Sequence, residues 1–170
     1  MSIYNNIPAS DNGFYNIVVE ISANNNCIKY EIDPITGVPT VDRFINVSMV
    51  YPCNYGFIPH TKGEDGDCAD ALIITRLPLM VGCVIKCKLL GMMLMEDEGG
   101  IDTKFVFVPA DKIDPTYKDI NDIDHLPSAL KDSIYHFFSH YKDHESGKHV
   151  TLNGWKGCNE ARIMLDSLIK

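Results

Sequence analysis

The sequence predicts an α+β fold: a small closed antiparallel β-barrel, OB-like in form, with two C-terminal helices packed on it. From Phe14 to Val108 the chain holds runs typical of strands, and from Leu126 onward its apolar residues fall at helical spacing. Strands followed by helices indicate an α+β protein, and successive antiparallel strands with a bulge suit a small barrel. A chain of 170 residues supports one core, so we expect a single domain over residues 1–170.

The strands are predicted by runs of Ile, Val and aromatic residues that are separated by turn residues. They cover Phe14–Ser22, Cys27–Asp33, Ala71–Thr75, Gly82–Met95 and Thr103–Val108. Gly91 is the expected bulge in the longest of them. Turns are expected at Asn24–Asn26 and Asp33–Gly37, and the acidic stretch Glu96–Lys104 lies between two strands like the tip of a hairpin.

Two helices are predicted in the last part of the chain. The first has apolar residues at helical spacing from Leu126 to Tyr141, with Pro127 near its first turn, and the second covers Cys158–Leu168. Three histidines recur every four residues on the first helix and should form one stripe: His136, His140 and His144. The stripe is either a solvated face or a contact between subunits, and it lacks the glutamate that a zinc-protease motif requires.

Composition excludes several classes of protein. The chain is 45% hydrophobic and 22% charged, as is usual for globular proteins. Its longest apolar run, Leu77–Ile85, is too short to span a bilayer, and Met1–Ser10 carries no secretory signal pattern. A net charge of −8 disfavours nucleic-acid binding. The six cysteines form no CxxC pair, so we expect free thiols in a reducing cytoplasm.

The densest group of acidic residues is Asp65-Gly66-Asp67-Cys68-Ala69-Asp70. Carboxylates this close together repel one another, and a hard divalent cation such as Mg²⁺ would compensate them. An isolated DxDxxD pattern is also compatible with a solvated acidic turn. It is not an EF-hand, because Ala69 and Arg76 stand where that motif needs ligands, and the chain has no GxxxxGK[ST] phosphate loop.

Two further charged pairs share a strand face by parity. Asp102 and Lys104 alternate in one predicted strand, and Lys29 and Glu31 alternate in an earlier one. Either pair alone is compatible with an exposed, solvated surface.

Taken together, six segments in this order resemble the soluble inorganic pyrophosphatase family of the barrel-fold type, in its bacterial form. The segments are Lys29–Asp33, Val41–Arg43, Tyr51–Pro59, Asp65–Asp70, Asp97–Lys104 and Phe138–Lys142. The resemblance covers Phe14 to the end of the chain. The family usually carries Pro-Leu where this chain has Cys68-Ala69. Loss of the proline should make the acidic loop less rigid, because proline restricts the unfolded chain.

The resemblance implies hydrolysis of pyrophosphate to two phosphates by in-line attack of a metal-bridged water, with several Mg²⁺ ions in each active site. It implies that Asp67 is the general base. The metal ligands would be Asp65, Asp70, Asp97, Asp102, Glu20 and Glu31. The groups that bind phosphate oxygens would be Lys29, Arg43, Tyr55, Lys104, Tyr141 and Lys142.

The expected substrate is a magnesium complex of pyrophosphate, and the expected assembly is a cytoplasmic homohexamer without nucleic-acid or membrane partners. Two alternatives stay open. One is a metal-dependent phosphoesterase for another small phosphate compound, which would need an apolar pocket for the organic group. The other is a barrel module that binds oligonucleotides, which would need a basic groove lined by aromatic residues.

Overall fold

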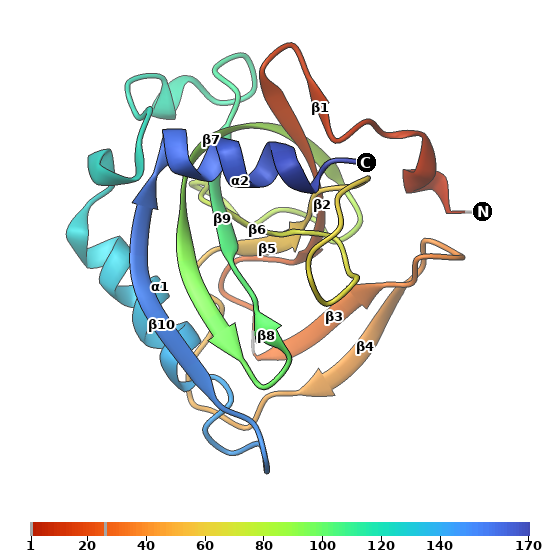
Figure 1. Ribbon diagram of the computed structural model, residues 1–170, viewed down its shortest axis with the longest axis vertical. Coiled ribbons are helices and arrows are strands. Elements are labelled where there is room, and N and C mark those ends of the chain that lie inside the picture. The colour runs from red at the N-terminus through yellow and green to blue at the C-terminus, as the bar shows by residue number, and fades with distance from the viewer. Residues whose placement is uncertain (1, 26) are drawn as a thin grey trace.

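Five strands close into a ring in the computed structural model of the chain, which describes residues 2–25 and 27–170 (Figure 1). Around the ring the strands follow the order β2 (Phe14–Ile21), β5 (Asn54–Phe57), β6 (Asp70–Ile73), β9 (Lys104–Pro109) and β7 (Val84–Asp97), and β7 pairs again with β2. The predicted small barrel with two helices is therefore confirmed. The predicted turn at 24–26 includes residue 26, which lies outside the described residues.

One pairing in the ring departs from the antiparallel prediction. Strands β6 and β9 run parallel, with Asp70 opposite Lys104 and Ile73 opposite Phe107. The pairing is parallel because β9 inserts between β6 and β7, so that two strands separated by a long stretch of chain become neighbours. Strand parity within one segment cannot reveal such a non-local contact. Its consequence is that Asp70 and Lys104 lie side by side at the same end of the barrel.

The remaining strands extend the barrel at its edges. A short β1 (Ser10–Asp11) pairs with β2, β8 (Gly100–Ile101) forms the predicted hairpin with β7, and β10 (Val150–Gly157) pairs along β7. Strands β3 (Ile28–Ile32) and β4 (Pro39–Phe44) form a separate two-stranded ribbon. The sequence patterns did not predict β4, β5 or β10 as strands.

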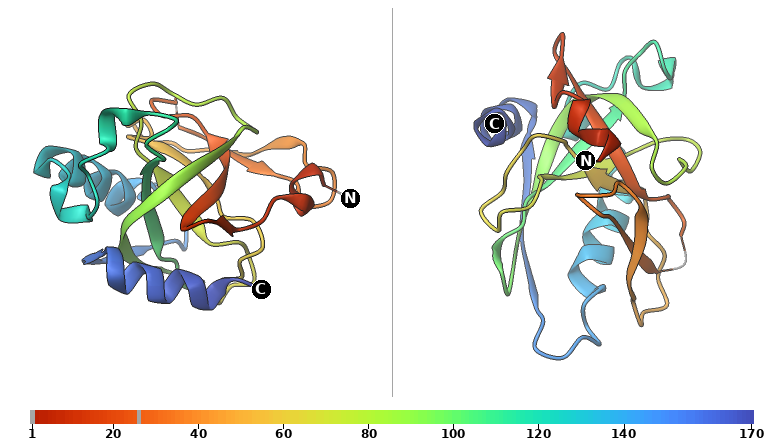
Figure 2. Two further views of the ribbon diagram at one scale, coloured as in Figure 1. Left: turned by 90° about the horizontal axis from the view of Figure 1, so that it is seen from above. Right: turned by 90° about the vertical axis from the view of Figure 1, so that its right-hand side faces the viewer.

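Both predicted helices are present, but β10 lies between them, so the chain does not end in two consecutive helices. They are α1 (Ser128–His140) and α2 (Cys158–Leu168), and Pro127 caps the start of α1. Figures 1 and 2 show that α1 and the β3–β4 ribbon lie on opposite sides of the barrel and that α2 crosses one end of it. Three short 3-10 helices complete the chain: η1 (Ile3–Asn6), η2 (Pro115–Tyr117) and η3 (Ile123–His125).

The predicted histidine stripe is only partly helical. His136 and His140 are exposed on α1, with their ring centroids 4.9 Å apart. The helix ends at His140, so His144 lies in the following turn and does not continue the stripe. His140 is oriented by Asp143, whose carboxylate lies 2.8 Å from Nδ1. The prediction of a three-residue helical stripe was therefore wrong for His144.

Glycine is required where two backbones approach closely. The predicted bulge at Gly91 is confirmed, because the register between β7 and β9 shifts between Leu89 and Gly91. A Cβ atom on Gly91 would lie 2.4 Å from the carbonyl oxygen of Lys156, and one on Gly56 would lie 2.0 Å from that of Val18. Both distances are too short for a side chain, so these glycines allow the close packing of the barrel.

Asn54 joins three segments at the end of β5. Its amide oxygen accepts hydrogen bonds from the backbone N–H groups of Ala23 and Leu79, both at 2.9 Å, and its amide nitrogen donates to the carbonyl of Ile73 at 3.0 Å. Asn54 is fully buried, so these bonds satisfy polar groups that water cannot reach. The asparagine of the Tyr51–Pro59 segment is therefore structural.

No helix in the part of the chain that the structure describes is long and apolar enough to cross a membrane.

Candidate active site

A cavity of about 710 Å³ opens beside the barrel, next to the β3–β4 ribbon and the turn that follows α1. All of the predicted site residues line it. They are Glu20, Lys29, Glu31, Arg43, Tyr55, Asp65, Asp67, Asp70, Asp97, Asp102, Lys104, Tyr141 and Lys142. The structure thus brings together residues that lie up to 122 positions apart in the chain, from Glu20 to Lys142. Their individual roles stay predictions.

Lys104 lies at the centre of the cavity floor, between two aspartates. Its ammonium donates hydrogen bonds to Asp70 and to Asp102, the latter at 2.5 Å, and only 3% of its side chain is exposed. The parallel pairing of β6 with β9 places Asp70 beside Lys104. Asp102 lies two residues before Lys104, in the link between β8 and the start of β9. The predicted proximity of Asp102 and Lys104 is confirmed by this contact, but Asp102 lies before β9 begins, so the two residues do not share a strand face.

Burial raises the pKa values of the Asp70 and Asp102 carboxyls, whereas the shared ammonium of Lys104 lowers them. Burial raises the pKa of Asp102 to about 7, and the neighbouring Asp70 carboxylate adds to this shift. Burial would also raise the pKa of Asp70, but the Lys104 charge outweighs it and holds this pKa below the ordinary value. One ammonium is therefore not enough to keep both carboxyls ionised, and the site has capacity for more positive charge.

Asp65 and Asp67 belong to the aspartate loop, which we define as residues 62–69. Gly66 adopts a φ of +95°, a conformation that favours glycine, and allows the loop to fold back on itself. The backbone N–H of Asp67 donates to the Asp65 carboxylate at 3.0 Å. Burial, together with the charges of Asp65 and Asp70, raises the pKa of Asp67. A carboxylate with a raised pKa is a better proton acceptor than an ordinary aspartate.

Glu20 extends from β2 into the cavity and is almost completely buried. Its Oε1 accepts a hydrogen bond from the backbone N–H of Ile32 at 2.8 Å, which fixes the carboxyl between β2 and β3. Burial raises the pKa of Glu20 to about 8, and the Ile32 hydrogen bond offsets only part of this shift. On the adjoining ribbon Lys29 donates to Glu31 at 2.5 Å, so the predicted shared face of these two residues is confirmed.

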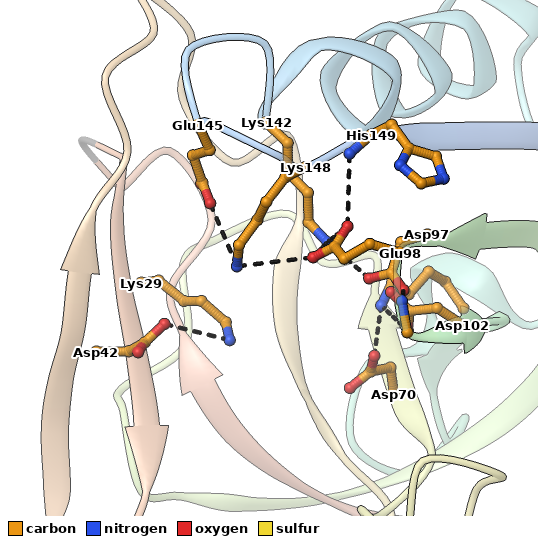
Figure 3. Close-up of polar contacts among 12 residues, drawn as sticks. Lys29, Asp42, Asp70, Asp97, Glu98, Asp102, Lys142, Glu145, Lys148 and His149 are labelled. Carbon is orange, nitrogen blue, oxygen red and sulfur yellow. Dashed lines mark hydrogen bonds and ion pairs between the residues drawn. The ribbon is translucent and has the colours of Figure 1, made fainter.

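The opposite wall is formed by a network of ion pairs (Figure 3). Lys142 Nζ lies 2.6 Å from the carboxylate of Asp97 and 3.4 Å from that of Glu98. Lys148 lies between Glu98, at 3.7 Å, and Glu145, at 3.5 Å. Figure 3 shows the Lys142 and Lys148 side chains extending toward the same acidic hairpin. Ion pairs therefore connect the turn after α1 to the β7–β8 hairpin.

Arg43 connects the ribbon to the same turn. Its Nε lies 2.9 Å from Glu145, while Nη1 contacts the neighbouring Asp42 at 2.5 Å. Sequence reasoning assigned no role to Glu145, Glu98 or Lys148, although Glu98 and Lys148 line the cavity. Glu98 lies inside Asp97–Lys104, one of the segments that resemble the family, and that position was the one signal that could have identified it.

Two tyrosines form the inner wall. The rings of Tyr55 and Tyr141 are buried, and Lys104 Nζ lies 5.6 Å from the centre of the Tyr55 ring. Burial raises the pKa of Tyr55 well above its ordinary value, and nearby carboxylates reinforce the shift. Tyr55 therefore keeps its hydroxyl proton and can act only as a neutral hydrogen-bond donor toward an anion.

The donor set fits hard divalent cations, although the carboxylates are held apart in this arrangement. Within residues 2–25 and 27–170 no three His, Cys, Asp or Glu side chains are gathered closely enough to hold a metal ion. The ammonium groups of Lys104 and Lys142 lie among the carboxylates and take the place of cations there. Carboxylate oxygens are the ligands that Mg²⁺ prefers, and burial raises the pKa of Asp102 and of Glu20, so a bound cation would stabilise their ionised forms.

The comparisons with known proteins agree with this geometry. The family model described as inorganic pyrophosphatase matches residues 17–170. The inorganic pyrophosphatase of Rickettsia conorii is 46% identical over 89% of this chain and 87% of its own length, and that of Aquifex pyrophilus is 50% identical over 85% and 81%. The solved inorganic pyrophosphatase of Helicobacter pylori superposes with a TM-score of 0.92 at 42% identity, covering 96% of both chains. This chain therefore belongs to the inorganic pyrophosphatase family.

Proposed function

We propose that this chain hydrolyses inorganic pyrophosphate to two phosphates and requires Mg²⁺. The proposal rests on one observation: a single cavity brings the carboxylates of the aspartate loop and the β7–β8 hairpin together with cations from the β3–β4 ribbon, from β9 and from the turn after α1. Pyrophosphate is a small, highly charged anion, and a site for it needs both metal ligands and cations that bind phosphate oxygens. Family membership supports the same reaction.

The metal ligands we propose are Asp65, Asp70, Asp97, Asp102, Glu20 and Glu31. When bound, Mg²⁺ would lower the pKa of water at the site and neutralise charge on the phosphates. Asp67 lies at the mouth of the cavity, and its raised pKa suits it to accept the proton of the attacking water. Asp67 would thereby orient that water for attack in line with the leaving phosphate.

The phosphate ligands we propose are Lys29, Arg43, Lys104, Lys142, Tyr55 and Tyr141. The four cations are paired with carboxylates in this structure. Substrate binding would exchange these partners for phosphate oxygens. The tyrosine hydroxyls would donate neutral hydrogen bonds, which stabilise the leaving phosphate without adding charge.

We further propose a cytoplasmic homohexamer that acts on the magnesium complex of pyrophosphate as one functional domain. All six cysteines lie within the described residues and are free thiols, which suits a reducing compartment. The exposed pair His136 and His140 on α1 offers a polar surface for contact between subunits. Nucleic acid and membrane are not expected as partners, because the chain is strongly acidic.

The proposal is tested by measuring phosphate release from pyrophosphate, ATP and p-nitrophenyl phosphate in parallel. We expect hydrolysis of pyrophosphate only, complete loss in excess chelator, and recovery with Mg²⁺. Recovery with Ca²⁺ should be poor, because this larger ion holds its ligands at longer distances. Full activity in chelator would contradict the metal requirement, and faster turnover of p-nitrophenyl phosphate would favour the phosphoesterase alternative.

A further inference from the structure

A buried threonine lies at the point where the chain enters the aspartate loop. Thr61 is 2% exposed, and its Oγ1 donates a hydrogen bond to the carbonyl of Ile58 at 2.6 Å. The same oxygen accepts a hydrogen bond from the backbone N–H of Ala69 at 2.8 Å. One hydroxyl therefore connects the segment before the loop to the last residue of the loop, immediately before Asp70 and β6.

Thr61 provides a connection that the loop does not make by itself. Inside the loop Gly63 N–H donates to the carbonyl of Asp67 at 2.7 Å, and Asp67 N–H donates to the Asp65 carboxylate at 3.0 Å. These bonds fix the internal turn. The last residue of the loop is held to the barrel by the backbone N–H of Ile58, which donates to the carbonyl of Ala69 at 3.0 Å, and by the Thr61 hydroxyl. Among the described residues, Thr61 is the one side chain outside the loop that forms a hydrogen bond to it. The hydroxyl therefore acts with the backbone bond from Ile58 to set where the loop lies relative to β6.

The residues that carry Thr61 are themselves held by both ends of the chain. Lys62 N–H donates to the carbonyl of Leu168 at 2.9 Å, and Lys170 N–H donates to the carbonyl of His60 at 2.9 Å. The ring of His60 contacts the carbonyl of Asn5 at 3.0 Å. Figure 1 shows the end of α2 beside this loop. Thr61 is thus a fixed point, and displacement of the loop requires its hydrogen bonds to break.

We propose that Thr61 is a positioning residue, whose hydroxyl holds the aspartate loop in the shape that binds metal. The inference rests on the proposed metal-dependent function.

The test compares Thr61→Val with Thr61→Ser on the full chain. Valine keeps the shape of threonine and removes the hydroxyl, so Ala69 N–H and the carbonyl of Ile58 are left unpaired. We expect Mg²⁺ binding, measured by calorimetry without substrate, to weaken about fivefold to tenfold in Thr61→Val. Thr61→Ser should bind Mg²⁺ as the wild type does, because it keeps the hydroxyl.

A matched control is available in Thr75, at the opposite end of β6 from Asp70. Its Oγ1 also makes two hydrogen bonds, donating to the carbonyl of Leu77 at 2.6 Å and accepting from the amide of Asn54 at 2.7 Å. Thr75 is half-buried, so Thr75→Val should lower the melting temperature less than Thr61→Val, and it should leave Mg²⁺ binding unchanged. Equal weakening of Mg²⁺ binding in both valine variants would overturn the proposal, since it would indicate general destabilisation.

Hydrogen exchange gives a measurement that does not depend on how well the variants fold. In the wild type without metal, the Ala69 N–H should exchange more slowly than the N–H groups of Glu64 and Asp65. Rapid exchange at Ala69 would overturn the proposal. Neither measurement uses pyrophosphate, so a Thr61→Val defect in metal binding would stand even if pyrophosphate proved not to be the substrate. Mg²⁺ binding that is equal in Thr61→Val and the wild type would overturn the inference and leave the proposed reaction intact.

Discussion

Replacing Lys104 with methionine should destabilise the metal-free protein and should do so less when Mg²⁺ is present. The ammonium of Lys104 is the shared partner of Asp70 and Asp102 on the cavity floor. Methionine fills a similar volume and removes the charge, so two partly buried carboxyls lose their counterion. Removal of one partner from a buried ion pair is costly because the remaining charge stays desolvated.

The loss of stability expected in Lys104→Met depends on how deeply the Asp70 and Asp102 side chains are buried. Breaking a fully buried pair costs about 3–5 kcal/mol, but Asp70 and Asp102 are 23% and 17% exposed and remain partly solvated. We therefore expect a loss of about 2–3 kcal/mol in the free energy of unfolding. For a chain of this length this corresponds to a fall of about 5–10 °C in melting temperature.

The assay is thermal unfolding of wild type and Lys104→Met, in excess chelator and in excess Mg²⁺. In chelator the full difference in melting temperature should appear. With Mg²⁺ a divalent ion replaces the missing ammonium beside Asp70 and Asp102, and the difference should shrink. Equal melting temperatures in chelator, or a difference that Mg²⁺ does not change, would refute the idea that metal and ammonium serve the same carboxylates.

Three further predictions concern other parts of the chain. Asp67→Asn should lower turnover with Mg²⁺ binding largely intact, whereas Asp70→Asn should weaken Mg²⁺ binding itself; the same response of both to raised Mg²⁺ would contradict this division of roles. Analytical ultracentrifugation should find an oligomer for the wild type and a smaller particle for a His136→Gln/His140→Gln variant, because this exposed pair on α1 is the proposed contact between subunits; an unchanged size would place the pair on a solvated surface. A mild oxidant should affect wild type and Cys68→Ser equally, because burial raises the pKa of the Cys68 thiol and suppresses its reactivity; selective loss in the wild type would contradict this.

Local patterns predicted most elements of the barrel. Strand β2 was predicted as Phe14–Ser22 and found as Phe14–Ile21, and the predicted bounds of α2 are those observed. β2 is marked by its content of Ile and Val, and α2 by apolar residues at helical spacing, and both are strong local signals. Strand β10 was missed because Gly154, with a φ of +88°, interrupts its alternation of exposed and half-buried residues. Strand β4 was missed because most of its residues are exposed and it carries no apolar face.

The site was predictable where the contact is local and unpredictable where it depends on topology. The contact of Lys104 with Asp102 is local, because the two residues are two positions apart, although Asp102 lies just before β9 and not in it. The contact between Lys104 and Asp70 requires the parallel neighbours β6 and β9, which no pattern within either segment indicates. The ion pair between Arg43 and Glu145 likewise depends on the contact between the β3–β4 ribbon and the turn after α1. Only the resemblance to a known family placed these segments in one site before the fold was known.

The pairing of charges explains how an acidic chain can bind an acidic substrate. The predicted site holds more carboxylates than cations, and each of the predicted cations already has a carboxylate partner. A phosphate anion that entered alone would have to break these pairs in a field of like charge, which desolvation makes stronger. Divalent ions would change this balance, because they would take over the carboxylates and release the ammonium and guanidinium groups for phosphate oxygens. The geometry therefore favours metal and pyrophosphate binding as a coupled event, with each making the other's ligands available.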